Sequence, residues 1–366
     1  MKIKVTQEKL SKALNNVSRI AIGKVTLPIL NNVLIRVDNK KVSLITTNLD
    51  MAIIDFLPVS SSEDGVVTVP AKLLAEFVSN LPKGEIIEIS SKDSKVTISA
   101  GKYSSTINGV VADDFPELPE INEKTAVTYK ISTEEFKNSV GQVIIASSND
   151  LTRPALTGVY FNTNDNILAI ASTDGYRLAE KKLINEVKSE VKAIVPANSL
   201  QEVLRSINED MEEVEISFSE DLVRFRLGEV EIISKLIDAS FPDYQKLIPK
   251  DNNIKVILNR EELTRVTKLA ALFARSVGGS IICETKKPNT FSVKSIANEF
   301  GENNSEIETK VGVEGKVNLN SRFLIDVLNA LEEKELEFSF SDHLSPIVIK
   351  NKKADNYTHI IMPLNS

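Results

Sequence analysis

Few side chains in this sequence are suited to nucleophilic or metal chemistry. The 366 residues include one cysteine, two histidines (His343 and His359) and no tryptophan. Cys283 lies in the apolar run SIICE, which indicates a buried structural thiol, and a single cysteine excludes a disulfide within the chain. A His/Cys metal site, or a serine or cysteine nucleophile activated by histidine, therefore has little material to draw on.

The 51 acidic residues leave carboxylate-metal chemistry open. Asp174, in the string TDGYRL, is the best candidate ligand for a metal-dependent nuclease or phosphatase. No paired carboxylate stands at a matching position nearby, and the DG pair is also a common hairpin-turn signal. We therefore predict no catalytic residue, no metal site and no cofactor. The hydrolase alternative predicts EDTA-sensitive hydrolysis of DNA that Asp174→Ala abolishes.

The composition is that of an ordinary soluble globular protein, with 42% hydrophobic and 26% charged residues. The length suffices for two or three domains. No apolar run is long enough to span a membrane, and the start MKIKVTQEKLSKAL lacks the apolar segment of a signal peptide, so we expect a cytoplasmic protein without membrane contact. The net charge of −7 argues against a simple nucleic-acid binder but leaves room for one basic face.

Three tandem copies of one unit position these residues. The stretches VTVPAKLLAEFVSNLPKGEIIEIS, AIVPANSLQEVLRSINEDMEEVEIS and KVNLNSRFLIDVLNALEEKELEFSFS each read as a strand, an amphipathic helix and an alternating strand. Their helices are entered at Pro70, Pro196 and Asn320, which are 126 and 124 residues apart. The phrase Phe-Pro-acid-apolar recurs at 115 and 241, and Pro363 stands at the third equivalent position. Chance similarity among β-rich segments would not keep several matched positions at a nearly constant spacing, so we interpret the pattern as a repeat.

A first helix also recurs in each copy, in TQEKLSKALNNVSRIA, STEEFKNSVGQVIIAS and NREELTRVTKLAALFA, each with a polar cap residue near a glutamate. Each is followed by an apolar strand: LPILNNVLI, RPALTGVYF and SVGGSIICE. The sequence therefore predicts an α+β fold of three similar domains, 1–125, 126–250 and 251–366, each with two helices packed on antiparallel sheets. The period is too long for a solenoid repeat.

The full chain resembles the bacterial β sliding clamp family, the processivity subunit of DNA polymerase III. The resemblance is carried by TLPILNNVL at 26–34, ASTDGYRLA at 171–179, SKLIDASFPDY at 234–244, LIDVLNAL at 324–331 and the terminal IIMPL. It implies a DNA-clamp fold and a head-to-tail homodimer, a six-domain ring with helices inside and sheets outside. At about 8–10 Å per neighbouring helix pair, the ring leaves an opening of roughly 20–28 Å, which admits a duplex.

The resemblance also implies partners: encircled double-stranded DNA held without sequence specificity, the replicative polymerase subunit, the clamp loader and other proteins carrying a Gln-, Leu- and Phe-rich motif. Such motifs insert between the second and third domains, where an apolar groove with nearby polar groups suits them. The matching positions are Arg153, Leu156, Thr173, Gly175, Tyr176, Arg177, Leu178, Pro242, Lys246, Leu247, Asn320, Phe323, Leu344, Pro346, Ile360, Met362, Pro363 and Leu364. Without the resemblance, most of the apolar ones would be read as core.

Two departures from the family pattern affect this groove. Lys246 stands where many relatives have arginine, which removes bidentate hydrogen bonding. The chain ends Leu364-Asn365-Ser366 where the best-known relatives end in Arg-Leu, which leaves the peptide preference at that end open.

For the DNA-facing surface, Lys24 and Lys72 match basic positions of the family, and Ser148 and Asn149 match a DNA-contacting loop. Ala197 and Asn198 replace basic residues, so contact from the second domain is weaker or comes from Arg205. From the residues alone, ordinary solvated helix faces are the preferred interpretation of the basic groups on these helices.

At the dimer contact, Ile107 lies in the edge strand expected over YSSTINGVV, and Leu272 and Phe273 follow the helix of the third copy. Exposed apolar groups and an unpaired strand edge suit pairing between subunits. The alternative is that Leu272 or Phe273 belongs to the core. A monomeric peptide-binding adaptor that never closes is the remaining alternative for the whole protein, and mass and shape in solution distinguish it.

Overall fold

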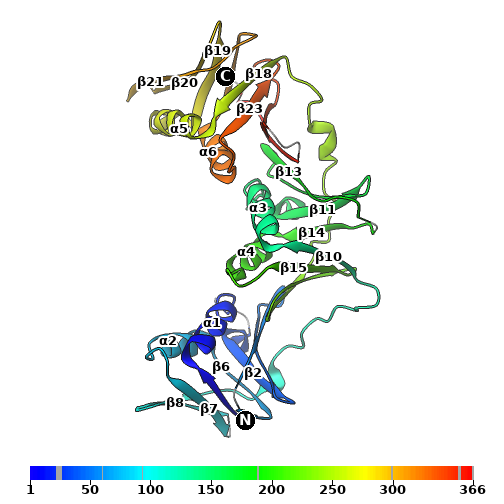
Figure 1. Ribbon diagram of the computed structural model, residues 1–366, viewed down its shortest axis with the longest axis vertical. Coiled ribbons are helices and arrows are strands. Elements are labelled where there is room, and N and C mark those ends of the chain that lie inside the picture. Colours follow the sequence, from blue (N-terminus) through cyan, green and yellow to red (C-terminus); the bar gives the residue numbers. More distant parts are fainter. Residues whose placement is uncertain are drawn as a thin grey trace. The chain divides into compact units, whose positions relative to one another are not determined.

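The computed structural model describes residues 1–21, 27–59, 61–92, 94–187, 189–297, 300–352 and 356–364. The chain divides into two compact units, Met1–Thr133 with Asn198–Leu236, and Glu134–Ala197 with Ile237–Ser366. The described residues form six α-helices and antiparallel sheets, as Figure 1 shows along the chain, so the predicted α+β class is confirmed.

The first unit contains two sheets, the helices α1 (Gln7–Val17) and α2 (Ala71–Ser79), and nearly all of α4 (Ala197–Ser206). In sheet order, the five-stranded sheet is β5 (Ser61–Glu63), β1 (Lys2–Thr6), β7 (Ile86–Lys92), β8 (Lys95–Ala100) and β9 (Tyr103–Asn108). The eight-stranded sheet is β10 (Val127–Ser132), β15 (Glu213–Phe218), β16 (Leu222–Leu227), β17 (Val230–Lys235), β4 (Met51–Leu57), β3 (Lys41–Thr47), β2 (Asn32–Asp38) and β6 (Gly65–Pro70).

The second unit contains nearly all of α3 (Thr133–Ile144), and α5 (Arg260–Ala274) and α6 (Ser321–Ala330). Its eight-stranded sheet is β14 (Lys192–Pro196), β11 (Gly158–Asn164), β12 (Ile167–Thr173), β13 (Arg177–Ile184), β25 (Tyr357–Ile361), β24 (Ile347–Asn351), β23 (Glu335–Phe340) and β18 (Ile254–Asn259). Its four-stranded sheet is β21 (Gly301–Glu308), β20 (Thr290–Ala297), β19 (Ser280–Lys286) and β22 (Gly315–Asn320).

Each eight-stranded sheet joins strands from two of the predicted copies. In the first unit, β17 pairs with β4, and Val230 lies opposite Asp55. In the second, β13 pairs with β25, and Lys181 lies opposite Tyr357. Antiparallel hydrogen bonding therefore continues from one copy into the next, which is why the compact units cut through the second copy. The domain limits near 125 and 250 stay a prediction.

The predicted helices form where the apolar spacing placed them. In α1, Leu10, Leu14 and Val17 recur at helical spacing and are fully buried, while the opposite face is polar. The helix α1 packs beside α2, and α5 packs beside α6 (Figure 1). The caps differ among copies, because Asn259 Oδ1 accepts a hydrogen bond from the Glu262 amide at 3.0 Å whereas the Thr6 side chain caps nothing.

The repeat extends to individual side-chain contacts. Thr46 Oγ1 donates to the Val17 carbonyl at 2.6 Å, and Ser172 Oγ donates to the Val143 carbonyl at 2.5 Å. Both members of the second pair stand 126 residues after those of the first. In the first two copies, the first helix is thus tied to its sheet by the same bond, and this makes these two copies comparable residue by residue.

The stretches expected to be plain apolar strands after each first helix are only partly strand. The first two begin with a 3-10 turn, η1 (Pro28–Asn31) and η3 (Pro154–Thr157), and their strands start at Asn32 and Gly158. In each, a proline lies in the first turn, where its missing amide hydrogen costs no hydrogen bond. The third runs through the 3-10 turn η5 (Arg275–Val277) into β19.

Asp55 is a buried residue of the first unit, and only 6% of its surface is exposed. Burial raises its pKa to about 6, although the Asn16 amide donates to Oδ2 at 2.8 Å and Lys12 and Arg19 oppose the shift. The unfolded carboxyl ionises near 4, so the native state holds the proton more tightly between about pH 4 and 6. This contribution to stability is present below pH 4 and is lost as the pH rises through 6.

Replacing Asp55 with asparagine keeps the shape and removes the buried charge. We expect Asp55→Asn to be more stable than the parent above pH 6, by on the order of 3 kcal/mol, and to lose this advantage toward pH 4. The midpoints of urea unfolding between pH 4 and 8 measure it. The matched control is Asp50→Asn, an exposed carboxylate in the turn before β4, which should leave the pH profile unchanged. A pH-independent difference for Asp55→Asn would contradict this account.

Candidate functional site

The turn between β12 and β13 is built by residues 173–177. Asp174 Oδ1 accepts hydrogen bonds from the amides of Tyr176 and Arg177 at 2.9 and 3.0 Å, which closes the turn. Thr173 Oγ1 donates to the Arg177 carbonyl at 2.6 Å and accepts from the Gly175 amide. Gly175 has a φ of +92°, a conformation that side chains rarely adopt, and an added Cβ would lie 3.3 Å from an Arg153 nitrogen. The turn therefore places Arg153 beside Gly175.

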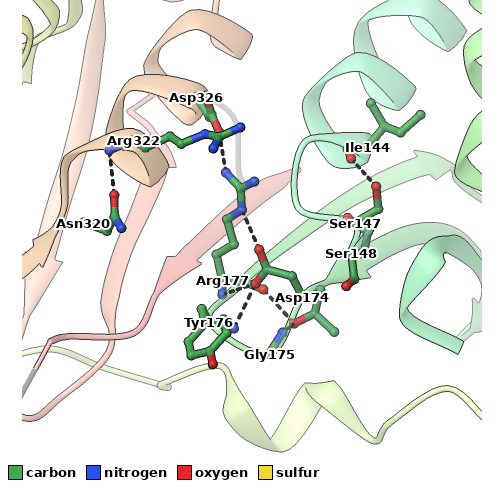
Figure 2. Close-up of polar contacts among 12 residues, drawn as sticks. Ile144, Ser147, Ser148, Asp174, Gly175, Tyr176, Arg177, Asn320, Arg322 and Asp326 are labelled. Atoms are coloured by element: carbon green, nitrogen blue, oxygen red, sulfur yellow. Dashed lines mark hydrogen bonds and ion pairs between the residues drawn. The ribbon is translucent and has the colours of Figure 1, made fainter. Parts of the chain in front are cut away.

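Arg177 is held between two aspartates from different parts of the chain. Its Nε donates to Asp174 Oδ2 at 3.0 Å, and one terminal nitrogen donates to Asp326 Oδ2 on α6 at 2.6 Å (Figure 2). The guanidinium also lies over the Phe323 ring, with 4.5 Å between its carbon and the ring centroid. Charge-assisted hydrogen bonds at both ends fix this side chain, so β13 and α6 present one rigid surface.

The C-terminal strand closes this surface from the other side. Leu178 lies opposite Ile360 in the pairing of β13 with β25, and the Met362 amide donates to the Tyr176 carbonyl at 2.8 Å. The Leu364 amide donates to the Asn318 carbonyl at 2.9 Å, which brings Pro363 and Leu364 to the strand before α6. Asn320 caps that helix, because its Oδ1 accepts from the Arg322 amide (Figure 2).

The remaining predicted residues flank this core. Pro346 precedes Ile347, which lies opposite Ile361, so it stands next to Met362; Leu344 lies in the same turn. The 3-10 turn η4 (Tyr244–Leu247) carries Lys246 and Leu247 and is anchored through Tyr244, which packs with Leu178 and Ile360. Leu156 lies in η3, and its backbone carbonyl accepts a hydrogen bond from the Ser148 amide.

Burial separates the floor of this surface from its contact groups. Leu156, Leu178 and Ile360 are at most 9% exposed, so they form the floor of the surface. Tyr176, Leu247, Leu344 and Met362 are 41–62% exposed, an unusual exposure for large apolar side chains gathered in one region. All eighteen predicted residues lie in the second compact unit. The arrangement suits an extended peptide with apolar anchors, which polar side chains such as Arg153 and Asn320 can hydrogen-bond.

The aspartate considered as a metal ligand has another role. Both carboxylate oxygens of Asp174 accept hydrogen bonds from the turn and from Arg177. In the part of the chain that the structure describes, no group of three or more His, Cys, Asp or Glu side chains is arranged to hold a metal ion.

Cys283 and His359 are fully buried, whereas His343 is exposed. Burial raises the pKa of the Cys283 thiol to about 12 and lowers the pKa of His359 to about 3. Cys283 is therefore the buried structural thiol that the sequence predicted.

The predicted DNA-facing residues are scattered over both units. Lys72 lies exposed in the first turn of α2, and Lys24 lies outside the described residues. Ser148 is 8% exposed and its Oγ accepts from the Asp150 amide, whereas Asn149 is exposed, so of these two residues Asn149 is the one open to solvent. Arg205, on α4, is exposed but pairs with Glu202.

Glu202 offsets two of the basic groups at once. It pairs with Arg205 and, at 2.7 Å, with Arg19, which also donates to Ser206 Oγ. We expect Glu202→Gln to raise the affinity for duplex DNA several-fold at low salt, with a steeper salt dependence, because one carboxylate no longer competes with phosphate. Fluorescence anisotropy with a labelled duplex over 20–200 mM salt measures this. The control Glu229→Gln, a carboxylate of the same unit with no such arginine pair, should change little, and equal effects of both substitutions would contradict the assignment.

The dimer candidates are placed differently from expectation. The strand β9 lies at the end of its sheet as predicted, but Ile107 is 6% exposed and packs inward. Alternate residues of an edge strand face opposite sides, and Ile107 falls on the covered one. Leu272 is 53% exposed and Phe273 is half-buried, and both lie in the last turn of α5 rather than after it. The core alternative is therefore wrong for Leu272.

The sequence reading missed several exposed groups. Ile296 on β20 and Phe300 before β21 are 57% and 65% exposed, next to the free edge of the four-stranded sheet. Asp326 was also missed, although it lies three residues after Phe323 and therefore on the same face of α6.

Among the described helices, none is long and apolar enough to cross a membrane.

The repeated fold and this peptide-type surface define a three-domain clamp protein. Sequence profiles of the DNA polymerase III beta subunit match the chain in order: the N-terminal domain over residues 1–119, the central domain over 130–243 and the C-terminal domain over 245–365. The chain belongs to the DNA polymerase III beta subunit family, the beta sliding clamps.

Relatives of this family match over the full length. The beta sliding clamp of Staphylococcus epidermidis is 28% identical, with all of both chains covered. The DNA polymerase sliding clamp of Bacillus subtilis is 27% identical, with a TM-score of 0.94 over 100% of this chain and 99% of that one. The sliding clamp of Bartonella birtlesii bound to griselimycin is 29% identical, with a TM-score of 0.93 over all of both chains. The fold predicted by resemblance is thereby confirmed.

Proposed function

We propose that two copies of this chain close head to tail into a ring that encircles duplex DNA and tethers the replicative polymerase, the clamp loader and other partners. The protein is a sliding clamp, the non-catalytic processivity subunit of its polymerase. The ring holds DNA by topology, so weak and sequence-independent phosphate contacts are sufficient.

The sharing of sheets between copies carries this proposal. The first and second copies join through β4 and β17, and the second and third join through β13 and β25. The strands that correspond to these in the repeat and remain at sheet ends are β21 of the third copy and β9 of the first. A third junction of the same kind therefore needs β9 from a second chain, and two such junctions close a dimer.

The dimer contact then consists of the β9 region with Ile107, and Leu272 and Phe273 on α5. Leu272 is half exposed in the single chain, which supports its burial by a partner. Ile107 lies on the covered side of the edge strand, so we propose that it packs beneath the dimer contact and does not touch the partner directly.

The DNA-facing residues are proposed to be Lys24, Lys72, Ser148, Asn149 and Arg205. A net charge of −7 over the whole chain disfavours binding of DNA to the outside, while local lysine and arginine side chains attract the encircled duplex. The pairing of Arg19 and Arg205 with Glu202 keeps that attraction weak, which favours sliding.

The partner motif is proposed to bind over the surface around Arg177, with its apolar side chains against Tyr176, Leu247, Leu344 and Met362. Lys246 pairs with Asp243 and is 83% exposed, so it contributes charge at the rim and not a fixed bidentate contact.

The proposed domains are 1–125, 126–250 and 251–366, which the matched ranges of the family support. A replication clamp acts on chromosomal DNA, which supports a cytoplasmic location.

The experiment that tests this function compares circular with linear DNA. The clamp is loaded onto a nicked circular plasmid with its own clamp loader and ATP, and bound clamp is separated by gel filtration at 0.3 M salt. We expect retention on the circle and loss within minutes after a restriction enzyme opens it. Equal retention on circular and linear DNA would show binding by contact and would overturn the encircling ring.

A further inference from the structure

A cavity of about 310 Å³ lies in the first compact unit, where the first and second copies join. Its walls come from α1, the end of β4, the turn at 208–211 and the start of β17. The lining residues include Ala13, Asn16, Asp55, Met211 and Val230. No residue of the proposed peptide, DNA or dimer sites lines this cavity, so it is unexplained by the clamp function.

The second unit shows what occupies the corresponding place between the second and third copies. There, Tyr357 lies opposite Lys181 in the sheet, as Val230 lies opposite Asp55 in the first unit. Lys181 and Gln142 each stand 126 residues after Asp55 and Asn16, the spacing that the matched Thr46 and Ser172 bonds establish.

Tyr357 is buried at its junction. It is 1% exposed, and its hydroxyl donates to the Gln142 carbonyl on α3 at 3.2 Å. The ring therefore spans the gap from the strand to the helix. In the first unit, the smaller Val230 stands at the strand, and both Val230 and Asn16 line the cavity. The cavity volume of about 310 Å³ is large enough to hold a phenol ring.

The polar groups of the cavity favour a neutral ring with a hydrogen-bond donor. Asn16 occupies one oxygen of Asp55, Oδ2, and a carboxylate accepts several hydrogen bonds. Lys9, Lys12, Asp210 and Glu229 also line the cavity, and Lys12 lies 3.6 Å from Asp210, so the charges offset one another. An anionic ligand would be repelled by the buried carboxylate, whereas Ala13, Met211 and Val230 offer apolar contact to a ring.

We propose that this cavity is a binding site for a small neutral aromatic molecule that carries a hydroxyl group, a phenol. Its ring lies against Val230 as the Tyr357 ring lies at the other junction, and its hydroxyl donates to Asp55. Occupancy fills the open space at this junction and stiffens the connection between the first two copies.

The test uses p-cresol, which is the tyrosine side chain as a free molecule, and toluene, which lacks only the hydroxyl. The full-length protein with labelled alanine, methionine and valine methyl groups is titrated by NMR. We expect millimolar p-cresol to shift the methyl signals of Ala13, Met211 and Val230 first. Toluene should bind about five- to tenfold more weakly, because it leaves the carboxylate unbonded. Absent shifts at these methyls, or equal affinity for toluene, would overturn the proposal.

A substitution provides the second arm. Val230→Tyr places a tyrosine at the register position of Tyr357, so its ring should occupy the cavity. We expect the variant to lose p-cresol binding at these methyls and to unfold at a higher temperature than the parent. A folded variant that binds p-cresol like the parent shows that the molecule sits elsewhere and contradicts the assignment. If Val230→Tyr fails to fold, the methyl titration of the parent protein decides alone.

Discussion

Replacing Leu272 with aspartate is expected to convert the protein from a dimer to a monomer. Leu272 is 53% exposed in the last turn of α5, and its apolar surface requires a cover that the single chain does not supply. A carboxylate buried without a partner at an apolar contact costs several kcal/mol, enough to raise the dissociation constant of a dimer by about 100-fold or more. Sedimentation velocity from 0.1 to 20 µM measures the change.

The matched control is Leu344→Asp, a substitution of the same kind at a residue that is 59% exposed. We expect it to leave the dimer intact and to weaken binding of a partner peptide. Leu272→Asp should show the reverse, with peptide binding preserved and retention on circular DNA lost. A Leu272→Asp protein that sediments as a dimer at 0.1 µM would place the subunit contact elsewhere.

Replacing Arg177 with alanine is expected to weaken binding of a peptide with a Gln-, Leu- and Phe-rich motif by about 10- to 100-fold. The substitution removes the stacking on Phe323 and leaves Asp174 and Asp326 without their shared cation. Breaking a well-ordered, largely buried charged hydrogen bond costs about 1.5–3 kcal/mol. Anisotropy with a fluorescently labelled peptide measures the affinity.

Two further variants separate fixed geometry from simple charge. Asp326→Asn keeps the shape and weakens one anchor of Arg177, so we expect an intermediate loss of affinity. Lys246→Ala removes a cation that is 83% exposed and pairs only at the surface, so the loss should be no more than about threefold. If Lys246→Ala were as damaging as Arg177→Ala, charge at the rim, and not the clamped guanidinium, would govern recognition.

The repeat could be predicted because it rests on local patterns. Helical and strand periodicities are written in contiguous residues, and proline or asparagine marks the start of each second helix at Pro70, Pro196 and Asn320. The structure places α2, α4 and α6 directly after these residues. The same anchors made the family resemblance specific over the whole chain.

The contacts between copies could not be predicted in this way. Asp326 reaches Arg177 across 149 residues, and only the pairing of β13 with β25 brings their elements together. Ile107 was expected at the surface, but the face to which an edge-strand residue points depends on the pairing register, which the sequence does not specify alone. The contrast of Val230 with Tyr357 appeared only after both registers were known.

The most direct test of the ring is size-exclusion chromatography coupled to small-angle X-ray scattering on the purified protein at micromolar concentration. We expect a particle of twice the 40.4 kDa chain mass, with a scattering profile that requires a hollow ring with an opening wide enough for duplex DNA. A monomer, or a dimer whose profile fits a compact or rod-like particle without a hole, would contradict it.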